Sequence, residues 1–554
     1  MKVKKMLSKV TMLIMVGILL VGCTATGEGG QKAGGKDGVK EVTVETSEDG
    51  TTREMEGNLY LEGLPIVKEK ETFTIAVIGH PLAKETYENK PAVIKAQEDT
   101  NIEIKWMEIP STGWQEKINI MFASGQLPDA IATGISASSI VKNLPQLIPV
   151  GDYIDRYAPH VSEVYNTYPE IKTMLEQEDG KIYSFMTNAH SARNDTTSGV
   201  LFLNKQWLDN LGLEVPTTVE EYYEVLKAFK EKDPNGNGLN DEIPLSFCQQ
   251  FYASQFSMLL GSFGIKDGSD HIMIENGKVE FAPAKPEYYE ALKYYNQLAK
   301  EELLDLEGFS QTQQQYYSKG QQMVVGSFLE YLPYFAVGEQ NDSQYIALPP
   351  LKSSVAEPLW DGQKEKFAGW SGGFVITKAC KNPEALIRWF DYVNSDFSTK
   401  MEWYFGERNV LWDMNDETGE YWYLNNLPEG VSKGEYRYSK SSGPHGPMFI
   451  TLDELDKFQL KDDPKGEQRS SYIDMLEPYF PEENMLTLFE SLEVTEEKAN
   501  LQVEIDNYIK SFVAQAVLSG IDDAKWQEHL DKLEKLNVGR YLELQQASYD
   551  RINK

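Results

Sequence analysis

The chain has 554 residues and a formal net charge of −33. That length can bury a large core and suggests two or more domains. The negative surface excludes nucleic acid and anionic lipid headgroups as general partners, and it favours neutral ligands over strongly anionic ones. Three cysteines are too few for a disulfide scaffold. Apart from Cys23, they are Cys248 and Cys380, which could pair or remain free buried thiols.

The first 22 residues have the pattern of an export signal. Lysines at positions 2, 4, 5 and 9 precede an apolar stretch over 12–20 that is too short for a stable membrane anchor. The run Leu20-Val21-Gly22-Cys23 resembles a lipobox, which implies cleavage before Cys23 and a diacylglycerol on its sulfur. The alternative is an ordinary signal peptide followed by an incidental cysteine. We therefore expect a protein anchored by lipid on the extracellular face of the cell membrane, without a transmembrane helix.

Residues 23–70 are expected to form a flexible tether between the lipid and the folded body. Over 24–58 the chain is rich in Gly, Lys, Thr and Glu and has few large apolar residues. A coil of this length would hold the body on the order of 30 Å from the membrane.

The body begins with alternating strand and helix patterns. Strands are predicted over 72–78, 102–106 and 128–132, with helices over 91–100 and 115–124 between them. Gly125 is a natural stop for the second helix. This order is typical of βαβ units, so the predicted fold class is α/β.

The remaining predicted elements continue in the same manner. Strands are expected over 181–185, 200–204, 277–282, 323–325 and 374–377, and helices over 219–230, 287–300 and 383–394. Residues 495–549 read as two amphipathic helical segments broken near Gly520.

The loop over 233–242, DPNGNGLNDE, has the pattern of a calcium site. Oxygen-bearing side chains recur at alternate positions, with Gly238 at the sharp turn of an EF-hand-like loop. An EF-hand would carry a bidentate Glu at its twelfth position, where this chain has Pro244, so an adjacent acidic pair must close the coordination sphere. The expected ligands are the side chains of Asp233, Asn235, Asn237, Asp241 and Glu242 with the Leu239 carbonyl. We expect a structural calcium between helix and strand, away from the ligand; a solvated turn is the alternative.

Several stretches resemble the extracellular solute-binding lipoproteins of bacterial carbohydrate ABC importers, namely solute-binding protein family 1 of the large Gram-positive oligosaccharide-binding type. They are KINIMFASGQLPD (117–129), LIPVGDYID (147–155), DGKIY (179–183), LNKQWL (203–208), GLEVPTT (212–218), the loop over 233–242, KNPEA (381–385) and RYL (540–542) with Tyr549. The set runs from about residue 70 to the end. Each stretch is weak alone, and their order and spacing make the set specific.

The resemblance implies a two-lobe periplasmic-binding-protein-like fold (type II), with crossing strands between the lobes and a ligand cleft. By this analogy lobe 1 comprises 71–188 and 355–396, and lobe 2 comprises 189–354 and 397–554. The lobes of such proteins close on a ligand by hinge motion. The resemblance further implies a monomer that binds an oligosaccharide, docks on ABC permease subunits and performs no bond chemistry itself.

Candidate ligand contacts combine aromatic faces, which cover the apolar faces of sugars, with planar polar groups, which bind hydroxyls. The aromatic candidates are Trp114, Tyr252, Phe328, Trp370 and Trp403, the last with its neighbours Tyr404 and Phe405; the polar candidates are Asp129, Arg193, Glu402 and Arg408. For each of them, plain core or solvated surface is the alternative.

The sequence contains no complete enzyme motif. GWSGG over 369–373 satisfies the G-x-S-x-G pattern, but a strand is predicted after Ser371 where a nucleophile elbow needs a helix. There is no H-E-x-x-H motif for a zinc hydrolase. The alternatives left open are a lipid-anchored glycan hydrolase, which would need a pair of carboxylates, a peptide binder with the same fold, and a sensor that presents its ligand to a membrane kinase.

Overall fold

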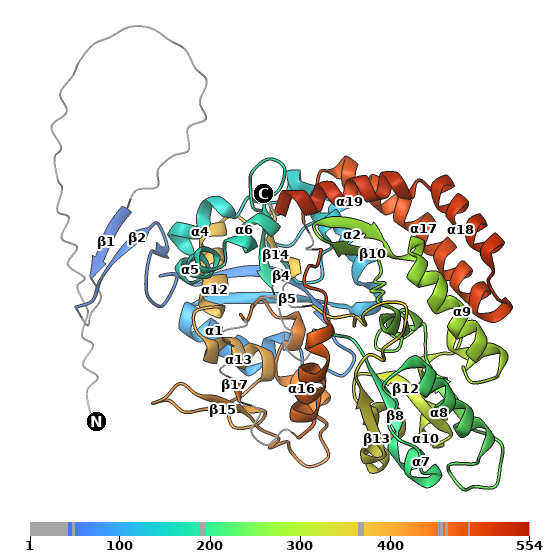
Figure 1. The fold of residues 1–554 in the computed structure, drawn as a ribbon. Helices are drawn as coiled ribbons and strands as arrows, with labels where there is room; N and C mark the ends of the chain where they lie inside the picture. The colour runs from blue at the N-terminus through green and yellow to red at the C-terminus, as the bar shows by residue number, and fades with distance from the viewer. Residues whose placement is uncertain are drawn as a thin grey trace, which may run out of the picture.

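The structure is a computed structural model that describes residues 42–46, 50–187, 196–363, 370–451, 454, 458–459, 464–485 and 488–552. A five-stranded and a four-stranded sheet lie in two separate hydrophobic cores, which we call lobe 1 and lobe 2 (Figure 1). The predicted two-lobe α/β class is thereby confirmed. Among the described residues, no helix is long and apolar enough to cross a membrane. The signal sequence and Cys23 lie outside the described residues.

The lobe-1 sheet is built on β4, whose run Phe73 to Ile78 is almost entirely buried. Helices cover both faces of this sheet, which explains why the strand is apolar throughout its second half. Strands β4, β5 and β6 are parallel, and β14 runs antiparallel between β6 and β7. The strand order is β5 (Ile102–Pro110), β4 (Glu71–Gly79), β6 (Ala130–Ala132), β14 (Trp370–Ile376) and β7 (Ser184–Thr187). Its helices are α1 (Pro91–Thr100), α2 (Trp114–Ser124), α3 (Ala137–Asn143), α4 (Gly151–Tyr157), α5 (Pro159–Thr167), α6 (Pro169–Leu175), α12 (Pro383–Val393), α13 (Phe397–Phe405) and α14 (Lys433–Lys440).

The lobe-2 sheet is centred on two fully buried strands, β8 and β12, which run antiparallel. Strand β9 is parallel to β12 on one side, and β13 is antiparallel to β8 on the other. The order is β13 (Tyr345–Leu348), β8 (Val200–Asn204), β12 (Val325–Glu330) and β9 (Ile243–Ser246). Its helices are α7 (Lys205–Leu211), α8 (Val219–Glu231), α9 (Pro286–Lys300), α10 (Gln313–Gln321), α11 (Pro333–Val337), α16 (Pro464–Leu476), α17 (Leu492–Ser519), α18 (Asp523–Lys535) and α19 (Val538–Ile552), with the 3-10 helices η4 (Phe256–Phe263) and η6 (Leu306–Phe309).

The C-terminal helices form a layer against α9, at the upper right of Figure 1. Helix α17 ends at Gly520, as predicted, where φ is 86°. The segment that follows contains a second break after α18, at Asn537 with a φ of 56°, so it forms two helices where one was expected. Two small sheets complete the molecule: the hairpin of β10 (Ile272–Glu275) and β11 (Lys278–Phe281), and the sheet of β15 (Trp412–Met414), β16 (Tyr421–Tyr423) and β17 (Phe458–Gln459).

The chain passes between the lobes more than once. The core residues leave lobe 1 after Met186 and enter lobe 2 at Val200, and they return between Trp360 and Phe374. Later the chain passes to α16 of lobe 2, touches lobe 1 again at Leu488 and Phe489, and ends in lobe 2. The two cores therefore interleave along the sequence, and we call 188–199 and 361–369 the first and second crossing segments.

Two of the predicted lobe boundaries are wrong. Residues 355–360 were expected in lobe 1, but Val355, Leu359 and Trp360 pack in the lobe-2 core. Residues 397–450 were expected in lobe 2, yet α13, α14 and the β15–β16 hairpin pack in the lobe-1 core. The cause is visible at Trp403, whose ring lies 6.2 Å from that of Trp106 and 5.8 Å from that of Trp389.

The predicted tether is also wrong over its second part. Strands β1 (Val42–Thr46), β2 (Thr52–Glu56) and β3 (Leu59–Tyr60) form an antiparallel sheet, at the left of Figure 1. This small sheet is fixed to lobe 1 through Glu56, which is paired with Arg156 and accepts a hydrogen bond from Tyr157 Oη at 2.6 Å. The polar composition concealed the strands because one side of the sheet faces solvent.

Candidate functional site

Both lobes turn the carboxyl ends of parallel strands toward the crossing segments. In lobe 1, β7 ends at Thr187 immediately before the first crossing, and β4, β5 and β6 end on the same edge because they run in the same direction. In lobe 2, the first crossing enters β8 at Val200, which pairs with Glu330 at the carboxyl end of β12. Ligands of open α/β sheets bind outside the carboxyl ends of the strands. These two edges therefore define the candidate ligand site.

The lobe-2 edge carries a buried acid, Glu330. Its Oε1 accepts a hydrogen bond from the backbone N–H of Tyr331 at 2.7 Å, and the residue is 0% exposed. Burial raises the pKa of Glu330 to about 8, although Arg469 nearby acts in the opposite direction. The side chain is thus largely a neutral carboxylic acid at pH 7 and can donate a hydrogen bond as well as accept one.

The loop after β9 brings an exposed ring to the same edge. Tyr252 is 60% exposed, and its ring lies edge-on to Phe251 with centroids 4.9 Å apart. Phe251 in turn contacts the ring of Tyr317 edge-on, at 6.0 Å. An aromatic face that is supported from behind and open to solvent is suited to stacking with a ligand.

The two crossing segments are fastened together where they join lobe 2. Trp360 Nε1 donates to Thr197 Oγ1 at 3.2 Å and to the Gly199 carbonyl at 3.1 Å. The buried Arg469 of α16 donates to the Thr197 carbonyl and to the Tyr331 carbonyl, and its guanidinium lies 3.9 Å from the centre of the Tyr331 ring. Arg469 therefore ties the first crossing to the carboxyl end of β12.

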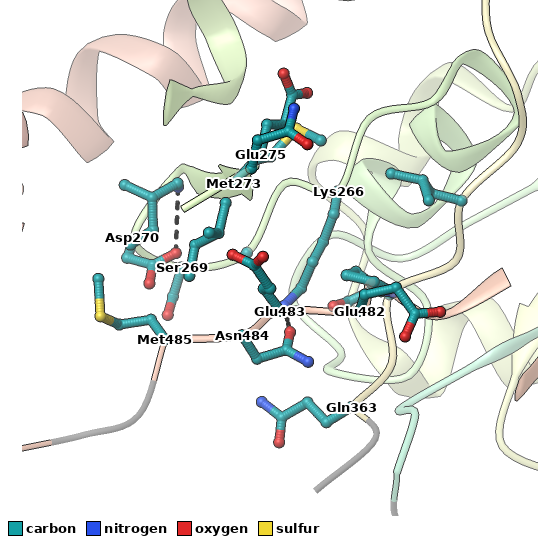
Figure 2. A pocket seen from close by; sticks show the side chains of 17 residues that line it. Lys266, Ser269, Asp270, Met273, Glu275, Gln363, Glu482, Glu483, Asn484 and Met485 are labelled. Atoms are coloured by element: carbon teal, nitrogen blue, oxygen red, sulfur yellow. Dashed lines mark hydrogen bonds between the residues drawn. The ribbon is translucent and has the colours of Figure 1, made fainter. Parts of the chain in front are cut away.

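A cavity of about 500 Å³, here called the hinge pocket, lies beside the second crossing (Figure 2). It is lined by the 266–276 region, by Leu359, Asp361 and Gln363, and by residues 481–485. Lys266 Nζ donates to Asn484 Oδ1 at 2.6 Å across the pocket. Burial raises the pKa values of Asp270 and Asp361. The pocket offers many polar groups, but no aromatic side chain is among the described residues that line it.

The 233–242 loop has the donor set of a hard-cation site. Asp233 accepts hydrogen bonds from the backbone N–H groups of Asn237 and Gly238, and Asn237 donates its amide to Asp241. Glu242 is 3% exposed, and both of its carboxylate oxygens are buried without a hydrogen-bond partner in the described structure. Burial, with Asp241 and Asp233 nearby, raises its pKa. A buried, unpaired carboxylate beside two further acids fits a calcium ion, which takes oxygen ligands.

The side chains of the loop do not form a preassembled metal-binding cluster in the described structure. Within the described residues, no three His, Cys, Asp or Glu side chains stand together as metal ligands. The loop oxygens instead accept hydrogen bonds from the loop's own N–H groups, including that of Leu239 to Asn237 Oδ1 at 2.7 Å.

The structure removes the buried aromatics from the predicted ligand contacts. Trp114 is 5% exposed and donates to the Gly134 carbonyl at 2.7 Å. Phe328 is 1% exposed between Phe202 and Tyr345, and Trp403 is 1% exposed. Tyr404 and Phe405 are buried with Trp403 in the lobe-1 core. These predictions are wrong because core packing uses the faces that a ligand would need.

Three of the polar candidates have partners within the chain. Asp129 accepts from the backbone N–H and the hydroxyl of Thr74, both at 2.7 Å, at the amino-terminal edge of β6. Glu402 lies on α13, 3.6 Å from Lys95, and burial raises its pKa. Arg408 is engaged by Asp413 and Asp416 within the β15–β16 hairpin. Each of them has a local structural role.

Of the other candidates, Tyr252 alone is seen at the candidate site. The side chain of Trp370 and the whole of Arg193 lie outside the described residues, although the backbone of Trp370 pairs with Thr187. Ser371 lies inside β14, so the nucleophile-elbow geometry is not present there. Gly373 allows a close approach, since a Cβ there would lie 2.3 Å from the Thr187 nitrogen.

Cys248 and Cys380 are free and buried in different lobes, so they do not pair. Glu330, Trp360 and Arg469 were missed. The only sequence signal for Glu330 is an acid that directly ends an apolar strand.

Comparison with known proteins identifies the family. The protein-family model described as bacterial extracellular solute-binding protein matches residues 83–397. The fructooligosaccharide ABC transporter substrate-binding protein FusA of Streptococcus pneumoniae serotype 4 is 30% identical over 519 residues, which cover 88% of this chain and 92% of the relative. The structure of S. pneumoniae FusA in complex with kestose has a TM-score of 0.75 at 27% identity, covering 87% of this chain and 99% of that one. A FusA EF-hand mutant in complex with fructo-nystose has a TM-score of 0.74 at 26% identity, with the same coverage. The chain belongs to the bacterial extracellular solute-binding protein family, and the prediction of a binding protein rather than an enzyme is confirmed.

Proposed function

We propose that this protein captures an oligosaccharide between its lobes and delivers it to the permease subunits of an ABC importer. The observation that carries the proposal is similarity over almost the full length to the substrate-binding protein of a fructooligosaccharide ABC transporter. The fold supports it, because two cores joined by crossing segments allow hinge closure over a ligand.

The test is binding of defined sugars to the purified mature protein. Kestose and fructo-nystose are neutral, whereas a galacturonate tetramer of similar size carries charge. We expect the neutral sugars to raise the melting temperature, since a ligand at 100 times its Kd adds about 2.7 kcal/mol of stability. The formal charge of −33 should disfavour the galacturonate. If no sugar stabilises the protein while a peptide does, the proposed substrate class is wrong.

A lipid-anchored glycan hydrolase, the rival from another class, is separated by the same samples. Incubation of the protein with kestose should release no free fructose. Turnover would refute a purely binding role.

Three predicted contacts remain candidates for the ligand site: Tyr252, Trp370 and Arg193. Tyr252 presents an exposed ring at the carboxyl edge of lobe 2. Trp370 opens β14 at the end of the second crossing, and Arg193 belongs to the first crossing. Alanine at each position should weaken sugar binding without lowering the melting temperature, and an unchanged affinity would remove that residue from the site.

A structural calcium in the 233–242 loop is the second part of the proposal. Asp233, Asn235, Asn237, Asp241 and Glu242 would hold it with the Leu239 carbonyl. The buried, unpaired Glu242 carboxylate supports this assignment, as does an EF-hand loop in a related protein. A bound ion would neutralise the carboxylates where α8 leads into β9.

The third part is anchoring. A diacylglycerol on Cys23 would hold the protein, as a monomer, on the extracellular face of the cell membrane beside its permease. Metabolic labelling with a palmitate analogue should mark the wild-type protein and leave Cys23→Ser unlabelled and released into the medium. Labelling of the variant would place the lipid elsewhere.

A further inference from the structure

A second cavity lies wholly within lobe 2, and none of the residues that line it belongs to the 233–242 loop. Its volume is about 310 Å³, and we call it the lobe-2 cavity. Its walls come from η4, the 267–271 loop, α9, η6 and the middle of α17. Because one lobe supplies every lining residue, the cavity is complete whether or not the lobes close.

One of the residues that line the cavity is a histidine held in one orientation by an aspartate. His271 is 8% exposed, and its Nδ1 lies 2.7 Å from Asp267 Oδ1. Asp267 Oδ2 accepts a second hydrogen bond from Tyr288 Oη at 3.0 Å. A carboxylate that already accepts from a hydroxyl can only accept from the ring as well, so Nδ1 carries a proton. The ring is therefore fixed, with Nε2 as its other polar atom.

Beside Nε2 lies a carboxylate oxygen from another element. His271 Nε2 and Asp506 Oδ1 form a long ion pair at 3.4 Å, and neither of these buried atoms makes a hydrogen bond of regular geometry in the described part of the chain. Although burial lowers it, Asp267 and Asp506 raise the pKa of His271 to about 10, so Nε2 bears a proton at pH 7. The cavity thus holds one donor next to one acceptor, paired by charge but each still lacking a hydrogen bond of good geometry. Leaving such groups unsatisfied is costly, and a bound group that could use both would recover that cost.

The rest of the lining is suited to a small amphipathic ring. Phe256, Ile509 and Val513 are buried, while Phe309 is half-buried and offers part of its face. Polar side chains of Gln249, Gln255 and Ser257 also line the cavity. Asp267, Asp506 and the protonated His271 together carry one negative charge. Lys510 at the wall offsets it, so the site has no net charge that would favour an ion.

We propose that the lobe-2 cavity is an accessory saccharide site that binds one neutral sugar residue through a pair of adjacent hydroxyls on His271 and Asp506. One hydroxyl accepts from Nε2–H and the other donates to the Asp506 carboxylate. The apolar face of the sugar ring packs on the aromatic wall, as sugars do on aromatic side chains. The site is independent of capture between the lobes and would hold a sugar residue on an open receptor.

The experiment uses small probes and a cavity-filling variant. Saturation-transfer NMR is recorded on the full mature protein with D-fructose, with cis-1,2-cyclohexanediol, and with cyclohexanol, which has the same ring and a single hydroxyl. Ser257→Phe fills the lobe-2 cavity without altering the polar pair. Ser519→Phe is the matched control, because Ser519 lines a different groove, between α17 and α18.

We expect the diol to bind at least tenfold more tightly than cyclohexanol, and its binding to fall at least tenfold in Ser257→Phe but not in Ser519→Phe. Asp506→Asn, which keeps the shape and removes the charge, should also weaken the diol at least tenfold. This second variant decides the matter if Ser257→Phe fails to fold. Equal binding of diol and cyclohexanol, unchanged binding in the variants, or no saturation transfer would overturn the proposal. Fructo-nystose affinity reports separately on capture between the lobes, and it should be equal in wild type and Ser257→Phe.

Discussion

Glu242 offers a test in which one substitution should have opposite effects with and without calcium. Glu242 is 3% exposed, its carboxylate has no hydrogen-bond partner among the residues that the structure describes, and it lies near Asp233 and Asp241. In chelator the buried negative charge of Glu242 destabilises the folded state. Glu242→Gln should therefore melt at the same temperature as wild type or higher. With calcium the carboxylate becomes a ligand, so the variant should lose the stabilisation that the ion confers.

The size of the calcium effect follows from mass action. An ion at 100 times its Kd stabilises the native state by about 2.7 kcal/mol. A domain of the size of lobe 2 shifts by roughly 2–4 °C per kcal/mol, so the wild-type melting temperature should rise by about 5–10 °C on adding calcium. In Glu242→Gln at the same calcium concentration, the increment should fall to less than half of that, because one of the three loop carboxylates is gone.

The same residue predicts a pH dependence in chelator. The pKa of Glu242 is raised above its ordinary value of 4.5, so the folded protein binds more protons than the unfolded chain between those two values. The contribution of Glu242 is complete below about pH 4.5 and is lost as the pH rises through the raised pKa. Wild type should therefore lose more stability than Glu242→Gln over this window.

The assay is thermal unfolding followed by circular dichroism, in calcium and in EGTA, with Glu231→Gln as the control. Glu231 is an exposed acid at the end of α8, close to the loop in sequence. Its variant should keep the full calcium shift. A wild-type melting temperature that EGTA leaves unchanged would show that the loop holds no stabilising calcium, and a full calcium shift in Glu242→Gln would show that Glu242 is not a ligand.

Three further substitutions separate packing from recognition and test the buried acid. Trp403→Ala removes a ring that is 1% exposed between Trp106 and Trp389, and it should cost about 3–5 kcal/mol in urea unfolding. A loss below 1 kcal/mol would contradict the assignment of Trp403 to the core. Tyr252→Ala should change stability by less than about 0.5 kcal/mol, because the ring is 60% exposed. The same substitution should lower the affinity for the oligosaccharide by up to about tenfold in calorimetry, which is what the loss of one aromatic contact costs. Unchanged affinity would argue against a ligand contact at Tyr252. Glu330→Gln should flatten the pH dependence of stability: the contribution of Glu330 is complete below about pH 4.5 and is lost as the pH rises through about 8. Parallel wild-type and variant profiles from pH 5 to 9 would show that Glu330 does not titrate in this way.

Local rules recovered most of the secondary structure from the sequence. Gly125 ends α2 with a φ of 70°, as a left-handed C-cap requires. Thr218 and Glu221 form a capping box at the start of α8, which places that helix within a residue of its predicted range. The apolar runs of β4 and β8 correctly indicated two buried sheets. These features depend on neighbours in sequence, so a single chain reveals them.

The ligand site depends on neighbours in space, and there the sequence was a poor guide. Trp403 and Tyr252 are both aromatic residues next to other aromatics, yet one is covered by Trp106 and Trp389 and the other is exposed. Nothing local distinguishes them. Glu330 has no motif at all, because its unusual pKa comes from burial at the end of a strand. The lobe boundaries failed for the same reason, since the partners that place α13 in lobe 1 lie far away in the chain.

The interleaving of the two cores has a consequence for the order in which the protein can fold during export. The lobe-1 core includes Leu59 near one end and Phe489 near the other, so it is incomplete until most of the chain has emerged. Lobe 2 in turn needs Tyr541 of the last helix. Lobe 1 therefore has all of its core residues before lobe 2 does, and in both lobes contacts of such long sequence separation slow folding. A chain truncated before α17 keeps every residue of the lobe-1 core but lacks the last part of the lobe-2 core, so it should yield no folded lobe 2.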